Sequence, residues 1–219
     1  MYPYDAAVFD LDGTLLNTLD DLADSTNYAL TCCGFPRRSL SEVRRFVGNG
    51  VANLIARAVP DGTGAENTKQ CLEVFRAHYL TNMRNKTAPY PGILQLLDAL
   101  NRAGIRVAVV SNKFDAAVKG LCHDYFGQRV AVAIGESASV RKKPAPDSAL
   151  AALDALGVAA DRAVYIGDSD VDIETARAAG MDCLSVTWGF RDADFLLDHG
   201  ARQLVPSVSE LAKCLGIHC

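Results

Sequence analysis

The segment Ala6-Ala7-Val8-Phe9-Asp10-Leu11-Asp12-Gly13-Thr14 decides the fold, because a run of apolar residues ends abruptly in two acidic ones. A short apolar run bounded by polar residues predicts a buried strand that leads into a loop. Asp10 and Asp12 are two residues apart, so their side chains start on the same side of the chain and can converge on one point. The sequence therefore predicts a polar site at the carboxyl end of a buried strand.

Short runs rich in Val and Ile recur along the chain and alternate with helical patterns. The clearest helix covers residues 93–103, where Ile93, Leu96, Leu97 and Leu100 share one face. Strands that alternate with helices favour right-handed crossovers, and so an α/β fold with a doubly wound parallel sheet. Further strands are expected at residues 105–110, 130–134, 163–166 and 183–186, and further helices at about 114–124, 147–156, 170–179 and 209–215.

The alternation breaks after the first strand. Between about residues 17 and 87 no convincing strand occurs, and glycine and proline separate helix-like segments near residues 34–36, 48–50 and 60–62. We therefore predict two domains: an α/β core formed by residues 1–16 and 88–219, and a helical insertion formed by residues 17–87.

Composition argues against several classes of function. A formal charge of −4 provides no basic field for nucleic acid, so we expect no nucleic-acid partner. No apolar stretch approaches the roughly 20 residues that cross a bilayer, and the N-terminus lacks a signal-peptide pattern, so we expect a cytoplasmic protein with no membrane partner. Seven cysteines without a C-x-x-C pair predict reduced thiols, and four histidines show no zinc-site spacing. The expected assembly is a monomer or a homodimer.

Two acidic clusters follow predicted strands. Asp10 and Asp12 form the first, and two carboxylates 4 Å apart repel each other by about 4 kcal/mol at an effective dielectric of 20, which a bound cation would relieve. The second cluster runs from Gly167-Asp168 to Asp172. Alone, each has a simpler interpretation: a solvated turn for the first and a capped helix start for the second. If their strands are neighbours, the two clusters form an oxygen-rich site of the kind that Mg²⁺ prefers.

Two further segments offer groups that suit a phosphate. Ser111 and Asn112 follow a predicted strand and offer a hydroxyl and backbone N–H groups at a helix start. Lys143 precedes Pro144 and provides a cation in a stiffened segment. The simpler interpretations are a helix N-cap for the first segment and an ordinary surface lysine for the second.

Taken together, these segments resemble the haloacid dehalogenase (HAD) superfamily of phosphatases. The resemblance implies a Rossmann-like HAD core, a helical cap domain inserted after the first strand, and Mg²⁺ as cofactor. The motifs that carry it are Asp10-Leu11-Asp12-Gly13-Thr14, Ser111 at the end of a strand, Lys143-Pro144, and Gly167-Asp168 with Asp172 four residues later.

The resemblance also implies roles for the acidic residues. Asp10 would attack phosphorus and form an aspartyl phosphate, while Asp12 would first protonate the leaving group and later activate water. Asp10, Asp168 and the backbone carbonyl of Asp12 would bind Mg²⁺. Asp172 would orient Lys143 or a metal-bound water.

Other residues would hold the substrate. Thr14, Ser111 and Asn112 are expected to bind phosphate oxygens, and Lys143 to offset the negative charge there. In the insertion, Arg45-Phe46-Val47-Gly48-Asn49-Gly50 resembles the R-x-x-V-G-x-G stretch of phosphoglycolate phosphatases. This makes Arg45, Gly48, Asn49 and Gly50 candidates for binding a substrate carboxylate, the alternative being a glycine-rich bend between helices.

The expected activity is hydrolysis of a small phosphorylated metabolite, with phosphoglycolate as the first candidate. Asn17 departs from many phosphoglycolate phosphatases, in which an acidic residue stands three positions after the Thr. A sugar-phosphate phosphatase, a pyrophosphatase and a phosphoglucomutase-like transferase therefore stay open within the family. Outside it, the alternative is a receiver-type phospho-acceptor or a non-catalytic binding module.

Overall fold

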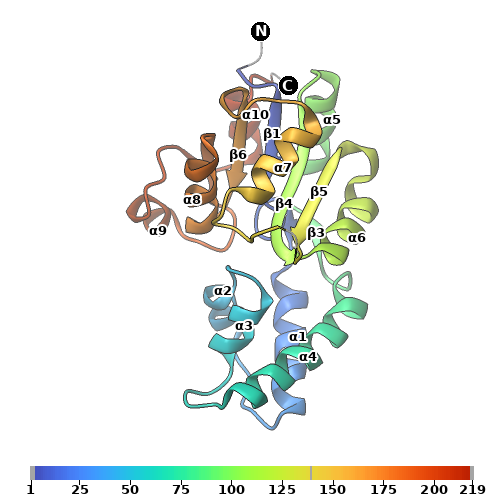
Figure 1. Ribbon diagram of the computed structural model, residues 1–219, viewed down its shortest axis with the longest axis vertical. Helices are drawn as coiled ribbons and strands as arrows, with labels where there is room; N and C mark the ends of the chain where they lie inside the picture. Colours follow the sequence, from blue (N-terminus) through green and yellow to red (C-terminus); the bar gives the residue numbers. More distant parts are fainter. Residues whose placement is uncertain (1–2, 139, 218–219) are drawn as a thin grey trace. The chain divides into compact units, whose positions relative to one another are not determined.

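A computed structural model describes residues 3–138 and 140–217, which form two compact units (Figure 1). The first contains the residues up to Leu16 and from Pro89 onward, and the second is Asn17–Ala88. The first unit is built on a six-stranded parallel sheet with the order β5-β4-β1-β6-β7-β8. Its strands are β1 (Ala6–Phe9), β4 (Arg106–Phe114), β5 (Val132–Glu136), β6 (Ala163–Gly167), β7 (Asp182–Val186) and β8 (Leu204–Val205).

The helices of the first unit cover both faces of this sheet, which confirms the predicted doubly wound α/β fold. After β1 the chain moves to β4 and β5, then returns to β6 on the other side of β1. Because right-handed crossovers in opposite directions cover opposite faces, α5 and α6 lie on one face of the sheet and α7 and α8 on the other. Helices α5 and α6 pack against β4, whereas α7 and α8 pack against β1, β4, β6 and each other. The helices are α5 (Ile93–Arg102), α6 (Asp115–Phe126), α7 (Asp147–Leu156), α8 (Asp170–Ala179), α9 (Ala193–Asp198) and α10 (Val208–Cys214), with short 3₁₀ turns at Gly127–Arg129 and Ala160–Arg162.

Alternation along the strands determines which side chains form each core layer. Ala6, Val8 and Tyr165 point to the α7 and α8 side, where they are fully buried with Ala149, Ala152 and Ala176. The small alanines let helices and sheet approach closely. Burial of this apolar surface drives folding at about 25 cal/mol per Å².

Several sequence-based boundaries were wrong. The strand expected at 105–110 continues to Phe114, so α6 begins at Asp115. The strand expected at 130–134 lies two residues later, at Val132–Glu136. The extension of β4 includes an irregularity in its pairing with β5, where β4 advances from Val110 to Phe114 while β5 advances only from Ile134 to Glu136. Neither the short strand β8 nor helix α9 was expected.

The second unit contains four helices: α1 (Leu19–Cys32), α2 (Leu40–Phe46), α3 (Val51–Ala58) and α4 (Ala65–Asn82). Helices α1 and α4 pack together, and Leu54, Ile55, Phe75 and Tyr79 are buried. Ser39 begins α2 with a capping box, because its hydroxyl accepts from the Glu42 N–H and the Glu42 carboxylate accepts from the Ser39 N–H. The chain enters and leaves this unit through the paired short strands β2 (Leu16–Asn17) and β3 (Ala88–Pro89).

Two properties expected from composition can be compared with the structure. Within the described residues, no helix combines the length and the apolar character needed to cross a membrane. The cysteines in this part of the chain are free thiols, as predicted. Cys219 lies outside the described residues.

Candidate active site

The polar site lies at the carboxyl ends of three neighbouring strands in the first unit. Phe9, the last residue of β1, pairs with Val109 of β4 and Ile166 of β6. Asp10 therefore leaves the sheet beside Gly167 and Asp168, the neighbour relation that the sequence argument required. In open α/β sheets, ligands bind at the carboxyl ends of the strands where the strand order reverses, and here it reverses at β1.

Three buried carboxylates converge here. One oxygen from each of Asp10, Asp168 and Asp172 lies within 4.8 Å of the other two. Lys143 lies among them: its Nζ donates to Asp10 Oδ1 at 2.8 Å and to Asp172 Oδ1 at 2.7 Å. Tyr165 of β6 also contacts the cluster, because its hydroxyl accepts from Lys143 Nζ at 3.1 Å.

Burial in this cluster alters the acidity of its groups. Burial raises the pKa of Asp10 to about 7 although the Lys143 ammonium opposes the rise. Burial likewise raises the pKa of Asp168 well above its usual range, and the charges of Asp10 and Asp172 add to this shift. Burial alone would lower the pKa of Lys143, but Asp10 and Asp172 raise it well above its ordinary value. The cluster is therefore short of positive charge.

This donor set fits a magnesium ion. One ammonium cannot balance three carboxylates, and Mg²⁺ is bound in proteins by one or two carboxylates together with waters and substrate phosphate. Asp10 and Asp168 are the residues that would hold it. Asp172 is already engaged, since its Oδ1 accepts from Lys143 and its Oδ2 accepts from the Ser169 hydroxyl at 2.6 Å.

Asp168 is held in place by close packing as well as by hydrogen bonds. The Phe190 N–H donates to its Oδ2 at 2.6 Å. A Cβ at Gly189 would lie 2.3 Å from that oxygen, and a Cβ at Gly13, whose φ is +91°, would lie 2.4 Å from it. Only glycine fits at these two positions. Neither Phe190 nor Gly189 belongs to a motif that the sequence argument identified.

Thr14 contacts the site through Asp168. Its hydroxyl is fully buried and donates to Asp168 Oδ1 at 3.3 Å, while its carbonyl accepts from Trp188 Nε1 at 3.1 Å. We therefore expect Thr14 to orient Asp168, and its binding of phosphate stays a prediction.

The irregular end of β4 directs Ser111 and Asn112 to different partners. Bulges near active sites commonly redirect side chains in this way. The Ser111 hydroxyl accepts from the Lys113 N–H at 3.2 Å. The Asn112 amide bonds both main-chain groups of Lys143: its Oδ1 accepts from the N–H at 2.8 Å and its Nδ2 donates to the carbonyl at 2.9 Å. The Asn112 side chain thus holds the backbone of Lys143, and substrate binding by Asn112 stays a prediction.

Lys113 is a site residue that the sequence argument missed. Its side chain is 2% exposed, and its Nζ donates to Asp12 Oδ1 at 2.7 Å and to Oδ2 at 2.9 Å. The Asp12 carboxylate thus pairs with this cation and is not part of the three-carboxylate cluster. Period-two alternation from Ser111 could have indicated Lys113, but only if the strand had been predicted to continue past Val110.

The residues expected to contact the substrate's carboxylate lie in the helical unit. Arg45 is exposed on α2. The following loop has three successive residues with positive φ: Gly48 at 112°, Asn49 at 62° and Gly50 at 86°. Because such values favour glycine, the loop forms the expected bend between α2 and α3. Its role in binding stays a prediction.

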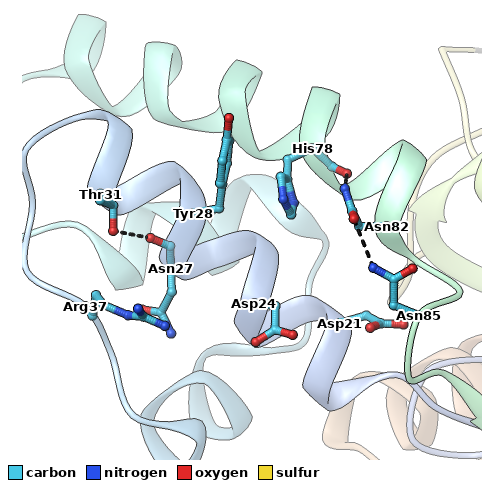
Figure 2. A pocket seen from close by; sticks show the side chains of 9 residues that line it. All are labelled: Asp21, Asp24, Asn27, Tyr28, Thr31, Arg37, His78, Asn82 and Asn85. Carbon is cyan, nitrogen blue, oxygen red and sulfur yellow. Dashed lines mark hydrogen bonds between the residues drawn. The ribbon is translucent and has the colours of Figure 1, made fainter.

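The helical unit also contains a pocket of its own, with a volume of about 440 Å³ (Figure 2). Most of its polar groups already bond within the unit. Both Asp21 oxygens accept from the Lys86 N–H, and the Asn27 amide bonds the main chain of Arg38. None of the predicted site residues lines it, so we assign it no chemistry. The lining residues are Asp21, Asp24, Asn27, Tyr28, Thr31, Arg37, His78, Asn82 and Asn85.

Comparison with known proteins agrees with this geometry. Residues 7–186 match the sequence model of the haloacid dehalogenase-like hydrolases. Phosphoglycolate phosphatase 1 of Pseudomonas aeruginosa is 30% identical over 94% of this chain and 78% of its own length. Phosphoglycolate phosphatase of Rhodospirillum rubrum is 35% identical over 84% of this chain and 80% of its own length.

Solved structures share the fold over the whole chain. A protein from Lactobacillus delbrueckii subsp. bulgaricus, provisionally named phosphoglycolate phosphatase, has a TM-score of 0.94 and 37% identity, covering 99% of this chain and all of that one. CbbY from Rhodobacter sphaeroides, solved in complex with phosphate, has a TM-score of 0.78 and 27% identity, covering 98% of this chain and all of that one. The match over residues 7–186 confirms the resemblance inferred from the motifs: the chain belongs to the haloacid dehalogenase-like hydrolases.

Proposed function

We propose that this chain is a Mg²⁺-dependent phosphatase that hydrolyses a small phosphate monoester, with phosphoglycolate as the first candidate. The observation that carries the proposal is that Asp10 and Asp12 each pair with a different lysine. Lys143 pairs with Asp10, and Lys113 pairs with Asp12. One carboxylate is thus available to attack phosphorus, and a second is held nearby for proton transfer. The relatives named phosphoglycolate phosphatase support the choice of substrate.

In the proposed reaction, an oxygen of Asp10 attacks phosphorus and forms an aspartyl phosphate, a known covalent use of a carboxylate. Asp12 protonates the leaving oxygen and later takes a proton from the water that cleaves the aspartyl phosphate. Lys143 stabilises charge on Asp10 and the phosphate, while Asp172 and Asn112 keep Lys143 in place. The bound Mg²⁺ would supply further charge neutralisation beside Asp10 and Asp168.

The helical unit would act as a cap that excludes water and selects the leaving group. This is the role that the family resemblance implies for an insertion after the first strand. Substrate preference would then depend on residues of the cap rather than on the chemistry of the core. The protein would act on a small metabolite, as a monomer or a homodimer, in the cytoplasm.

A phosphate-release assay on a panel of phosphorylated metabolites, with Mg²⁺ and with EDTA, tests this function. We expect steady release from phosphoglycolate that EDTA abolishes, because chelation removes the cation that balances the carboxylates. The panel should include a sugar phosphate, pyrophosphate and an aryl phosphate to compare the alternatives within the family. Labelling of the protein to one phosphate per chain without turnover would contradict the proposal and support a phospho-acceptor.

Replacing Arg45 with Ala tests the proposed contact with the substrate carboxylate. We expect KM for phosphoglycolate to rise by about tenfold, because a hydrogen bond to a charged group contributes about 1.5–3 kcal/mol. KM for p-nitrophenyl phosphate, which lacks the carboxylate, should stay unchanged. Arg76→Ala is the matched control, since Arg76 is an exposed arginine on α4 of the same unit. Equal KM effects on both substrates would argue against the contact.

A further inference from the structure

Lys113 is a buried cation whose position the family motifs do not explain. Its side chain is 2% exposed and its partner Asp12 is 16% exposed, so the pair is largely shielded from water. A lysine is rarely buried to this extent unless it is paired. Both Asp12 oxygens accept from the same ammonium, at 2.7 and 2.9 Å, which fixes the plane of the carboxylate as well as its position.

The backbone of Lys113 is held as firmly as its side chain. Its N–H donates to the Ser111 hydroxyl. Gly135 of β5 packs against it so closely that a Cβ there would lie 2.7 Å from the Lys113 carbonyl oxygen. The Gly135 N–H donates to Asp115 Oδ1 at 3.0 Å, which anchors the start of α6 just beyond. The end of β4 is thus a rigid support for the ammonium.

The two lysines of the site approach from different segments and have different partners. Lys143 contacts Asp10 and Asp172, whereas Lys113 contacts Asp12. Within the Asp10–Asp12 pair, Lys143 therefore forms its ion pair with Asp10 and Lys113 with Asp12. Two short contacts from one ammonium to a single carboxylate indicate that Lys113 holds Asp12, whatever else it does near the phosphate.

We propose that Lys113 is a positioning residue for Asp12, aligning it for proton transfer and stabilising the carboxylate it becomes. This inference rests on the proposed function. As the bond from Asp10 Oδ to phosphorus forms, the bond to the leaving oxygen breaks and its electron pair remains on that oxygen. The leaving oxygen takes the proton of Asp12, and the resulting carboxylate pairs with the Lys113 ammonium. The same carboxylate later accepts a proton from the hydrolytic water.

The test compares leaving groups, because only a poor leaving group needs a proton from Asp12. In the Lys113→Met variant we expect kcat/KM for phosphoglycolate, an alkyl phosphate, to fall by about 10- to 100-fold, part of the 10²–10⁴-fold that a general acid contributes. For p-nitrophenyl phosphate, whose phenolate leaves unprotonated, kcat/KM should fall less than about threefold. Because kcat/KM reports the first phosphoryl transfer, slow hydrolysis of the aspartyl phosphate does not obscure the comparison.

Lys119→Met is the matched control, since Lys119 is an exposed lysine of α6 that pairs with Asp115 at 2.6 Å. It should leave both substrates unaffected. Lys113→Gln keeps a hydrogen-bond donor, so its kcat/KM should also fall selectively for phosphoglycolate, by a smaller factor. This variant replaces Lys113→Met if the Met variant does not fold. Equal losses on the two substrates in the folded variant would overturn the positioning role. A wild-type protein that hydrolyses neither substrate would overturn the proposed function, and this inference with it.

Discussion

Replacing Asp10 with Asn is expected to abolish phosphate release, with a loss of about 10⁴-fold or more, since removal of a covalent nucleophile takes away the main reaction path. The amide has no carboxylate oxygen with which to form the phosphoenzyme, and it replaces the ion pair that Lys143 makes at 2.8 Å with at most a neutral hydrogen bond. The measurement is phosphate release at saturating Mg²⁺, together with a search for phosphorylated protein in a rapid acid quench. Steady turnover by this variant would exclude Asp10 as the nucleophile.

The same variant should remain folded, which separates loss of chemistry from loss of structure. Burial raises the pKa of Asp10 to about 7, so between about pH 4 and pH 7 the folded state holds a proton that the unfolded state has lost. Stability of the metal-free wild type therefore falls as pH rises through that window. Asn carries no titrating proton, so in EDTA the variant should lose less stability than the wild type between pH 5 and pH 8.

Asp5→Asn is the control for this substitution, because Asp5 lies just before β1, is exposed and pairs with Arg162 at 2.9 Å. Water screens an exposed ion pair, so the activity and the pH dependence of this variant between pH 5 and pH 8 should match the wild type. A wild type whose thermal stability in EDTA does not decrease between pH 5 and pH 8 would contradict the raised pKa of Asp10.

The sheet and the cluster could be predicted from sequence because both depend on local patterns. The apolar run before Asp10 and the run before Asp168 each required burial, and parallel strands bring their carboxyl ends to one edge. Lys143 was identifiable by its place before Pro144 within the motif order. These inferences needed only residue type, spacing and strand order.

The sequence could not predict the end of β4 or the side-chain hydrogen bonds of the site, because both depend on residues that are distant along the chain. The polar run from Ser111 to Lys113 suggested a helix start, yet pairing with β5 keeps it in the strand as far as Phe114. The true hydrogen-bond partners of Thr14 and Asn112 are likewise far away in sequence. Tertiary contacts override local preference at such positions, so a residue's presence in a motif did not reveal what its side chain contacts.

Replacing Lys143 with Met should be the second most damaging change, and its effect on stability should depend on the metal. Removal of the ammonium takes away the cation that bonds Asp10 and Asp172, and breaking a buried ion pair costs about 3–5 kcal/mol. In EDTA we expect a fall in Tm of roughly 10 °C, since 1 kcal/mol corresponds to about 2–4 °C in a chain of this size. Mg²⁺ should restore part of this loss, because a second cation can balance the same carboxylates.

Activity should not recover with the metal, because Lys143 donates directly to an Asp10 oxygen and Mg²⁺, which Asp10 and Asp168 would hold, would supply charge but no hydrogen-bond donor. We expect kcat to remain about 10²–10³-fold below the wild type at saturating Mg²⁺, the range typical for loss of one preorganised charge-stabilising group. Lys142→Met is the neighbouring control, since Lys142 is exposed and its variant should keep both stability and turnover. If Mg²⁺ restores both the stability and the activity of Lys143→Met, Lys143 acts only as a counter-charge. If Mg²⁺ restores the stability alone, Lys143 acts on the reacting phosphate.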